Sequence, residues 1–386
     1  MKRPDALSLA NWREAPTSHW AFQHIDQILP CASVVVADNP CELSSAAIDL
    51  GDVVFEGING VNWTLDALLD RTSTDALFVA HQGTLVCQRS SGDYDVNNPH
   101  IVFSVSKSLT AIVAGVLVDS GQLDTSRRIT HYVPEVSHSA YGDCSVQHVL
   151  DMTVSTAFEE DYTATQGDYI HYRKATGWNP VDDGEASVGL HTFLESVAPG
   201  TDPHGMRFRY RSPNSDLLGW VLERASGVPL AELFSQYLWQ PIGASSNAVL
   251  TVDALGAGRS AGGFCATPAD LVKVGEMVRL RGTFNNTQIV SEKWVSDCAT
   301  GGDINAWDRG DLCLFLPRGC YRNQWYRIDR DKSAFCAIGI HGQWLYIDPH
   351  AEVVIVKLSS QSVPVDELID RATIRAFESV CDFLTQ

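Results

Sequence analysis

The longest regular pattern of hydrophobic positions lies near the end of the first third of the chain. Val105, Leu109 and Ile112 recur at helical spacing, and most of the positions between them are also apolar. Such a segment predicts a helix that is buried on nearly every side. The pair Ser120-Gly121 follows and is a typical helix end.

Strand patterns occur near both ends of the chain. In the N-terminal part of the chain, two short apolar runs flank His81-Gln82-Gly83, which predicts a β-hairpin with glycine in its turn. Later runs rich in β-branched and aromatic residues predict three further strands at 335–340, 343–347 and 353–358. A helix over residues 365–384, with an apolar stripe, is expected to follow them.

Between these strands the pattern is helical and rich in loops. We therefore predict an α+β fold, in which one antiparallel sheet is built from both ends of the chain and flanked by helices. Residues 1–100 and 255–386 would form this sheet domain, and residues 101–254 an inserted, mainly helical domain with the active-site loops. Residues 156–190 show no clear periodicity, which is typical of a functional loop or of an irregular surface excursion.

Composition narrows the choice of partners. The 386 residues are 45% hydrophobic and 19% charged, which is typical of a globular protein, and the formal net charge is −19. Nucleic acid and anionic membranes both attract basic surfaces, so neither is an expected partner. No apolar run approaches the roughly 18 residues of a membrane span, and the N-terminus shows no signal peptide, which favours a cytoplasmic location.

Cofactor chemistry is not indicated by the sequence. The ten cysteines are scattered and include no Cys-x-x-Cys pair, so zinc-finger spacing is absent and no metal is expected. The expected partner is a small-molecule substrate. A homodimer is neither predicted nor excluded, because neither the composition nor the hydrophobic pattern decides the oligomeric state.

Ser104 and Lys107 stand three residues apart at the start of the predicted buried helix, in the chain's single Ser-x-x-Lys sequence. At helical spacing the lysine amine lies one turn above the serine hydroxyl. A serine hydroxyl needs a base to become a nucleophile, and a lysine whose pKa is lowered by burial can serve. Both could instead be ordinary helix residues, but a lysine in an apolar helix is costly without a partner or a function.

A second serine competes with Ser104 for the role of nucleophile. Ser260 lies in Gly258-Arg-Ser-Ala-Gly262, which fits the Gly-x-Ser-x-Gly elbow of α/β-hydrolases. That elbow requires a serine at a turn that leads directly from a strand into a helix. Here the next helix cap is Thr267, seven residues later, and no buried strand runs into Gly258. The context therefore disfavours Ser260.

Several short motifs, in order along the chain, resemble one group of enzymes. They are Trp20-Ala-Phe22, Ser104-Val-Ser-Lys107, Tyr210, Gln324-Trp325 and Ile338-Gly-Ile-His-Gly-Gln343. With them the chain resembles the serine hydrolases of the β-lactamase and penicillin-binding-protein fold, over nearly its whole length. It is most similar to the 6-aminohexanoate-dimer (nylon-oligomer) hydrolases, with class C β-lactamases and family VIII carboxylesterases further off. The resemblance implies a β-lactamase/transpeptidase-like fold.

The resemblance also implies roles for individual residues. Ser104 would be the acylated nucleophile, Lys107 its general base, and Tyr210 the group that passes a proton to the leaving group. The backbone N–H groups of Ser104 and Ile340 would form the oxyanion hole. A cationic lysine beside Tyr210 would favour its phenolate, because an opposite charge stabilises the ionised form.

Further positions would contact the substrate, again by resemblance. Tyr162 would touch the leaving amine, Trp325 would form a wall of the site, and His341-Gly342 stands where relatives carry Lys-Thr-Gly. Arg173 and Ala261 occupy places where groups that hold the substrate amine are expected. An arginine repels an ammonium, which argues against the 6-aminohexanoate dimer itself and leaves acyl-transfer chemistry intact.

Together these features predict a serine hydrolase that acts through an acyl-enzyme on carboxylic esters or linear amides. One alternative is an acyltransferase of the same fold, which product analysis with an added alcohol or amine would reveal. Another is an acylated sensor or an inactive penicillin-binding-like protein. A labelled adduct that never discharges would favour that second alternative.

Overall fold

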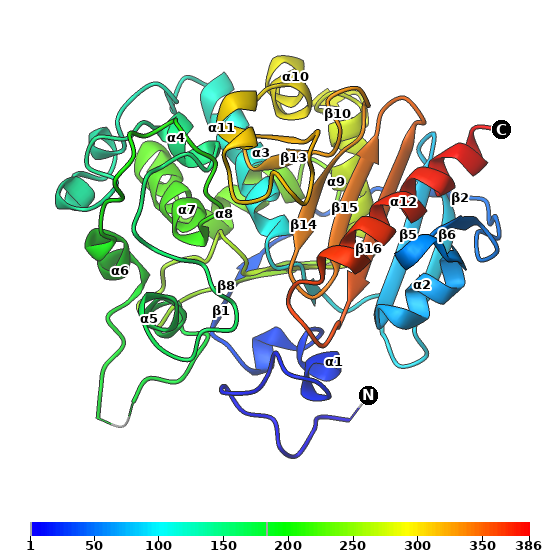
Figure 1. The fold of residues 1–386 in the computed structure, drawn as a ribbon, viewed down its shortest axis with the longest axis horizontal. Helices are drawn as coiled ribbons and strands as arrows, with labels where there is room; N and C mark the ends of the chain where they lie inside the picture. Colours follow the sequence, from blue (N-terminus) through cyan, green and yellow to red (C-terminus); the bar gives the residue numbers. More distant parts are fainter. Residues whose placement is uncertain (1, 183) are drawn as a thin grey trace.

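An eight-stranded sheet forms the centre of the computed structural model, which describes residues 2–182 and 184–386 (Figure 1). Its order is β12-β13-β14-β15-β16-β5-β6-β2, and only the short β2–β6 pair is parallel. The strands are β2 (Ser44–Ser45), β5 (Thr74–His81), β6 (Thr84–Ser90), β12 (Cys320–Arg322), β13 (Trp325–Arg327), β14 (Phe335–Gly339), β15 (Gln343–Asp348) and β16 (Val353–Ser359). Strands from the two ends of the chain pair at β16–β5, so the predicted antiparallel sheet is confirmed.

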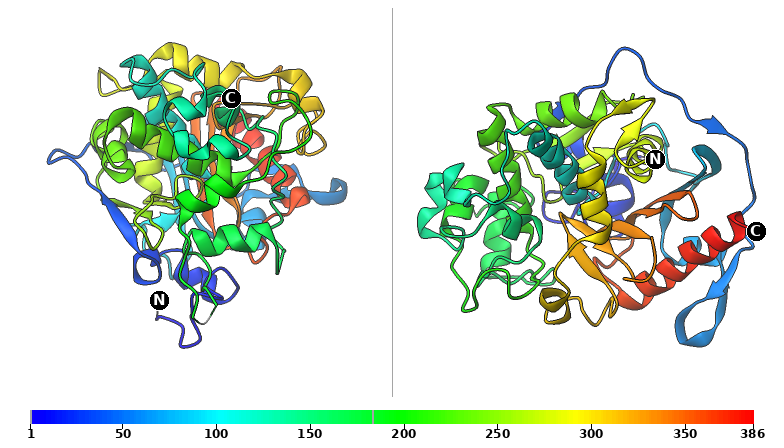
Figure 2. Two further views of the ribbon diagram at one scale, coloured as in Figure 1. Left: turned by 90° about the vertical axis from the view of Figure 1, so that its left-hand side faces the viewer. Right: turned by 90° about the horizontal axis from the view of Figure 1, so that it is seen from above.

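Helices cover both faces of this sheet. Alternate residues of β15 point in opposite directions, as the period of a strand requires. Trp344 and Tyr346 pack against Phe377 of α12 (Glu367–Leu384), whereas Leu345 lies in the core that also contains α9 (Pro268–Arg279). Figure 2 shows α12 along the outer side of the sheet, opposite the helical part of the molecule.

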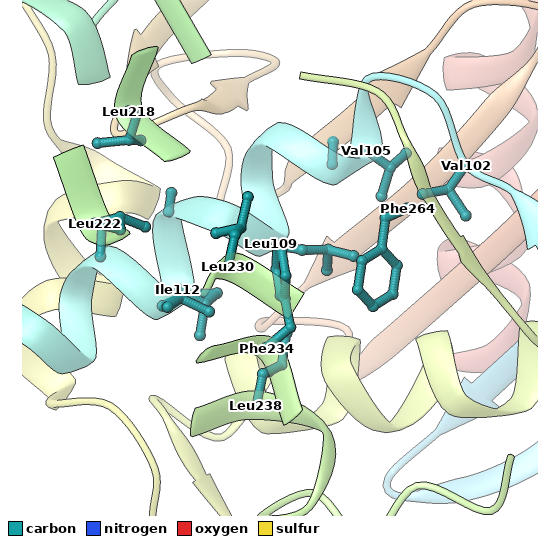
Figure 3. Close-up of a cluster of buried hydrophobic side chains, with 14 of the residues drawn as sticks. Val102, Val105, Leu109, Ile112, Leu218, Leu222, Leu230, Phe234, Leu238 and Phe264 are labelled. Carbon is teal, nitrogen blue, oxygen red and sulfur yellow. The ribbon is translucent and has the colours of Figure 1, made fainter. Parts of the chain in front are cut away.

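The helical part surrounds α3, which runs from Val105 to Asp119 as the pattern predicted. Its other helices are α4 (Val146–Leu150), α5 (Asp168–Ala175), α6 (Leu190–Ser196), α7 (Ser212–Ser226) and α8 (Leu230–Phe234). Figure 3 shows Leu109 and Ile112 of α3 against apolar side chains of α7 and α8. The helix α5 lies within 156–190, where no regular element was expected, because its charged and aromatic residues mask any apolar stripe.

The remaining elements are short. A second sheet has the order β1-β8-β9-β7 and joins β1 (Cys31–Val34), β7 (His100–Ile101), β8 (Ala248–Thr251) and β9 (Phe264–Ala266). The other helices are α1 (Thr17–Ala21), α2 (Leu65–Arg71), α10 (Glu292–Thr300) and α11 (Ile304–Asp308), and the other strands are β3 (Val54–Glu56), β4 (Asn62–Thr64), β10 (Thr283–Phe284) and β11 (Thr287–Gln288). None of the described helices is long and apolar enough to cross a membrane.

The packing of α3 predicts a large loss of stability on truncation of its buried face. Leu109 is completely buried, so Leu109→Ala is expected to lower the free energy of unfolding by about 2–5 kcal/mol. Val116 lies on the same helix but is only partly buried, and Val116→Ala should cost clearly less. Urea unfolding of both variants measures the difference. Equal losses would show that α3 is not held by the contacts in Figure 3.

Candidate active site

Ser104 lies at the point where the chain enters α3. It is the N-cap residue of that helix, and the Ser106 N–H donates to the carbonyl of Phe103 at 2.9 Å. Phe103 has a φ of +45°, which is unusual for a residue with a large side chain. Strained backbone of this kind persists only where the surroundings hold it, and it often marks a functional site. Here it directly precedes Ser104, whose Oγ lies 2.8 Å from Lys107 Nζ.

Lys107 is buried, with 1% of its surface exposed. Its Nζ lies 2.8 Å from Ser104 Oγ, 3.1 Å from Ser212 Oγ and 2.6 Å from the carbonyl oxygen of Ala261. Burial lowers the pKa of Lys107 to about 8, although the negative charge of Glu160 acts in the opposite direction. Only a minor fraction of this lysine, about one fifth at pH 7.4, is therefore neutral and able to accept a proton.

Ser212 and Glu160 complete a chain of hydrogen bonds beside the lysine. Ser212 Oγ donates to Glu160 Oε1 at 2.5 Å, and the Ser212 backbone N–H donates to the other carboxylate oxygen. The Tyr162 hydroxyl also donates to Glu160, at 3.0 Å. Sequence reasoning missed Ser212 and Glu160 as site residues, although Ser212 stands only two positions after Tyr210.

Tyr210 lies across the site from α3, with its ring centroid 5.0 Å from Lys107 Nζ. Burial raises the pKa of Tyr210, and so does the charge of Glu160, while hydrogen bonds with Ser104 and Tyr326 act in the opposite direction. The expectation of a phenolate is therefore wrong, because burial outweighs the effect of a lysine that is itself partly neutral. Tyr210 carries its proton and can donate it.

The end of β14 closes tightly onto the start of α3. A Cβ atom on Gly339 would lie 2.5 Å from the Val102 carbonyl oxygen and 3.1 Å from the Ser104 nitrogen, so only glycine fits there. This contact brings Ile340, the next residue, to the cavities that Ser104 also lines. The oxyanion hole expected from the N–H groups of Ser104 and Ile340 remains a prediction, and this close approach supports it.

Two cavities meet at Ser104, and they differ in character. One has polar and apolar lining in about equal parts and contains three guanidinium groups, and we call it the arginine cavity; its lining includes Arg13, Glu160, Arg173, Trp178, Arg259 and His341. The other is mostly apolar, and we call it the tyrosine cavity; its lining includes Tyr210, Leu312, Phe315, Tyr326 and Ile338. Ser104, Tyr162 and Ile340 line both cavities.

Some of the residues predicted to bind substrate line a cavity beside Ser104, and one lies in the core instead. Arg173 and Ala261 line the arginine cavity, and Tyr162 lies at the junction. Trp325 is completely buried and packs edge-on against Phe335. Trp325 therefore belongs to the core, whereas we expected it to form a wall of the site. The expectation failed because the sequence alone did not show which side of β13 faces inward.

His341 and Gly342 form the turn between β14 and β15. His341 lines the arginine cavity, and its Nδ1–H donates to the Gln361 carbonyl at 2.7 Å. Burial lowers its pKa to about 4, so the ring is neutral. Gly342 has a φ of +85° and packs against the side chain of Gln361, which leaves no room for a larger residue.

Ser260, the competing serine, is completely buried. Its hydroxyl donates to the Ser215 carbonyl at 2.7 Å, and it lies between β8 and β9 rather than at a turn from a strand into a helix. Among the residues that the structure describes, no basic side chain is hydrogen-bonded to the Ser260 hydroxyl, and its complete burial keeps it from a substrate. Of the two candidate serines, Ser104 alone lines a cavity beside a lysine.

Comparison with known proteins agrees with this geometry. The model of the family described as β-lactamase matches residues 63–378, which is most of the chain. The chain belongs to the β-lactamase family. A 6-aminohexanoate-dimer hydrolase from Paenarthrobacter ureafaciens is 34% identical over 363 residues, which cover 92% of this chain and 89% of that protein.

Solved structures of the family show the same fold. One from Bacillus anthracis, provisionally named a 6-aminohexanoate-dimer hydrolase, is 25% identical, has a TM-score of 0.90 and covers 100% of this chain and 99% of its own. A class C β-lactamase in complex with cefoxitin is 15% identical, with a TM-score of 0.57 and coverage of 82% and 96%, and so shows the fold alone. The β-lactamase/transpeptidase-like fold is confirmed, and the protein is a hydrolase.

Proposed function

We propose that this hydrolase acts through an acyl-enzyme on Ser104, with carboxylic esters or linear amides as substrates. The contacts of Lys107 Nζ support this proposal most directly. A neutral amine has two N–H bonds and one lone pair. Lys107 can therefore donate to Ala261 and Ser212 while its lone pair accepts the proton of Ser104 at 2.8 Å. This is the arrangement that a base-activated serine requires.

Acylation then follows from the groups around Ser104. Lys107 takes the proton from Oγ as Oγ attacks the substrate carbonyl, and the N–H groups of Ser104 and Ile340 hold the resulting oxyanion. When the bond to the leaving group breaks, the Tyr210 hydroxyl gives its proton to the departing oxygen or nitrogen. The Lys107 ammonium returns a proton to Tyr210, so the acyl-enzyme forms with both residues in their starting states.

Deacylation uses Lys107 again. Lys107 removes a proton from a water molecule that attacks the acyl carbonyl, and the Lys107 ammonium returns this proton to the Ser104 oxygen as it leaves. Esters are expected to react faster than amides, because an alkoxide leaves more easily than an amine. The named activity of the relative from Paenarthrobacter ureafaciens supports a linear amide as a further substrate class.

Trapping of the acyl-enzyme tests this proposal. The protein is mixed with 4-nitrophenyl acetate, quenched in acid and digested, and the peptides are analysed by mass spectrometry. We expect one acetyl group on the peptide that contains Ser104, absent from Ser104→Ala and retained in Ser260→Ala. An adduct on another residue, or product release with no adduct in any quench, would contradict the proposal.

The pKa of Lys107 predicts how ester hydrolysis depends on pH. Its neutral form is the base and its pKa is about 8, so kcat/KM should rise with pH, about tenfold per unit at low pH, and level off above about 8. Measurement of kcat/KM between pH 5 and pH 10 checks this result. A rate that is constant across that range would exclude Lys107 as the base.

Variants of the neighbouring residues Glu160 and Glu159 test what determines the pKa of Lys107. The charge of Glu160 raises the pKa of Lys107, so Glu160→Gln should move the rising limb of the profile to lower pH. Glu159 is a matched control, because its exposed carboxylate pairs with Arg211. Glu159→Gln should leave the limb where it is.

A further inference from the structure

The arginine cavity gathers positive charge in a strongly acidic protein. The chain has a formal net charge of −19, yet Arg13, Arg173 and Arg259 line one cavity next to Ser104. They come from the N-terminal segment, from α5 and from the loop between β8 and β9. In Figure 1 the N-terminal segment lies below β1 and β8, and α5 lies to their left. Only the fold brings these three side chains together.

Neutral and aromatic groups, rather than carboxylates, hold two of the guanidinium groups. Asn179 Oδ1 accepts from Arg13 Nη2 at 2.7 Å and from Arg173 Nε at 2.9 Å. The centroid of the Trp178 ring lies 4.0 Å from Arg259 Cζ and 5.7 Å from Arg13 Cζ. An amide oxygen and an indole face orient these cations without removing their charge.

Among the described residues, Asp216 is the one carboxylate within ion-pair distance of these three arginines. Arg259 pairs with Asp216 at 3.5 Å, but Asp216 also accepts from Tyr172 and from the Ala261 N–H. Within the described part of the chain, the buried Nε of Arg259 has no hydrogen-bond partner. Burial and repulsion from Arg259 lower the pKa of Arg173 to about 10.

Glu160 and Glu14 are the carboxylates that line the cavity itself. Glu160 accepts hydrogen bonds from Ser212 and Tyr162, and Glu14 is exposed at the rim. The cavity thus contains donors that suit an anion. A guanidinium group presents planar pairs of N–H donors that match a carboxylate.

The position of Tyr210 indicates which part of a substrate would meet these arginines. Tyr210 lines the tyrosine cavity, and under the proposed mechanism it donates its proton to the leaving group. The leaving group therefore occupies the tyrosine cavity. The acyl chain, on the other side of the carbonyl, extends from Ser104 into the arginine cavity.

We infer that the arginine cavity binds a carboxylate at the far end of the acyl chain, so that the preferred substrates are monoesters or monoamides of dicarboxylic acids. This inference rests on the proposed acyl-enzyme function, which decides the direction of the acyl chain. The terminal carboxylate of such a substrate is negatively charged, whereas a 6-aminohexanoyl chain ends in a positively charged ammonium.

Three esters that differ only at the end of the acyl chain test this inference. They are the mono-4-nitrophenyl ester of adipic acid, 4-nitrophenyl hexanoate and 4-nitrophenyl 6-aminohexanoate, which end in a carboxylate, a methyl group and an ammonium. Hydrogen bonds to charged groups contribute about 1.5–3 kcal/mol, so kcat/KM should favour the carboxylate over the methyl ester by about 10- to 100-fold. The ammonium ester should be the poorest.

Variants of the half-buried arginines identify the source of this preference. Arg173→Gln and Arg13→Gln should each reduce the ratio between the carboxylate and methyl esters, and Arg173→Glu should favour the ammonium ester. Arg127 lies on the surface with 60% of its side chain exposed, so Arg127→Gln is the matched control and should keep the wild-type ratio. Wild-type ratios near one would overturn the inference while leaving the acyl-enzyme function intact.

A binding measurement makes the inference independent of turnover. Calorimetric titration of Ser104→Ala with monomethyl adipate, methyl hexanoate and methyl 6-aminohexanoate, which differ only at the far end of the acyl chain, should show binding of monomethyl adipate, weakened by Arg173→Gln in the same background. If monomethyl adipate binds no better than methyl hexanoate, the inference is wrong. If it binds but no ester is hydrolysed by the wild type, the carboxylate site stands and the proposed function fails.

Discussion

Replacement of Ser104 by alanine is expected to lower kcat/KM for 4-nitrophenyl butyrate by about 10⁴-fold or more, because it removes the hydroxyl that we propose forms the acyl-enzyme. The loss should appear mainly in kcat, since the cavities on both sides of Ser104 remain. A small residual rate would reflect the oxyanion donors and substrate binding alone. Initial rates of purified variants, compared with the rate in buffer, measure the effect.

Two serines provide controls for this result. Ser260→Ala removes a hydroxyl that is buried and bonded to Ser215, so it should keep most of the activity. Ser212→Ala removes a hydrogen-bond partner of Lys107 and should give an intermediate loss. If Ser260→Ala abolished activity while Ser104→Ala did not, the assignment of the nucleophile would be wrong.

Lys107→Met is expected to lower kcat/KM by about 10³-fold, within the range found when a general base is removed. Methionine fills much of the space of the lysine chain and places no charge in the core. Because burial of Lys107 is costly, this variant should unfold at the same temperature as the wild type or higher. A rise in stability together with a loss of activity would show that the lysine is kept for chemistry.

The pH profile separates a catalytic role for Lys107 from a structural one. In Lys107→Met the rising limb near pH 8 should disappear, and the remaining activity should depend only on hydroxide and on other groups. Thermal unfolding and circular dichroism provide the control for folding. A variant that keeps the limb would assign it to another residue.

The helix of Lys107 and the sheet were predictable because their signals are local. The spacing of Val105, Leu109 and Ile112 and the apolar runs around His81-Gln82-Gly83 depend on periods of 3.6 and 2, which follow from backbone geometry. Ser104 and Lys107 were found for the same reason, since three residues of helix place them together. For this pair, which lies on one helix, the sequence was sufficient to predict that the two side chains lie together.

The rest of the site depends on contacts between distant segments. Arg13 and Arg259 are 246 positions apart, and they share Trp178 only because the N-terminal segment folds over the loop after β8. Trp325 was misplaced because a strand of three residues does not reveal its inner face. The protonation of Tyr210 was misjudged because burial, which decides it, is a property of the folded protein.

The segment around Trp12 has a consequence for how this enzyme could change. Trp12 stacks on Phe103 with ring centroids 6.2 Å apart, and Arg13 is its neighbour in the arginine cavity. The eight-stranded sheet does not include this segment, and Ser104 and Lys107 belong to another part of the chain. If the arginine cavity selects the substrate as inferred, replacement of Arg13 would alter substrate choice, whereas loss of Trp12 would also remove a ring that packs on the residue before Ser104. In practical terms, proteolytic removal of the segment that carries Trp12 and Arg13 would be expected to change both the rate and the specificity.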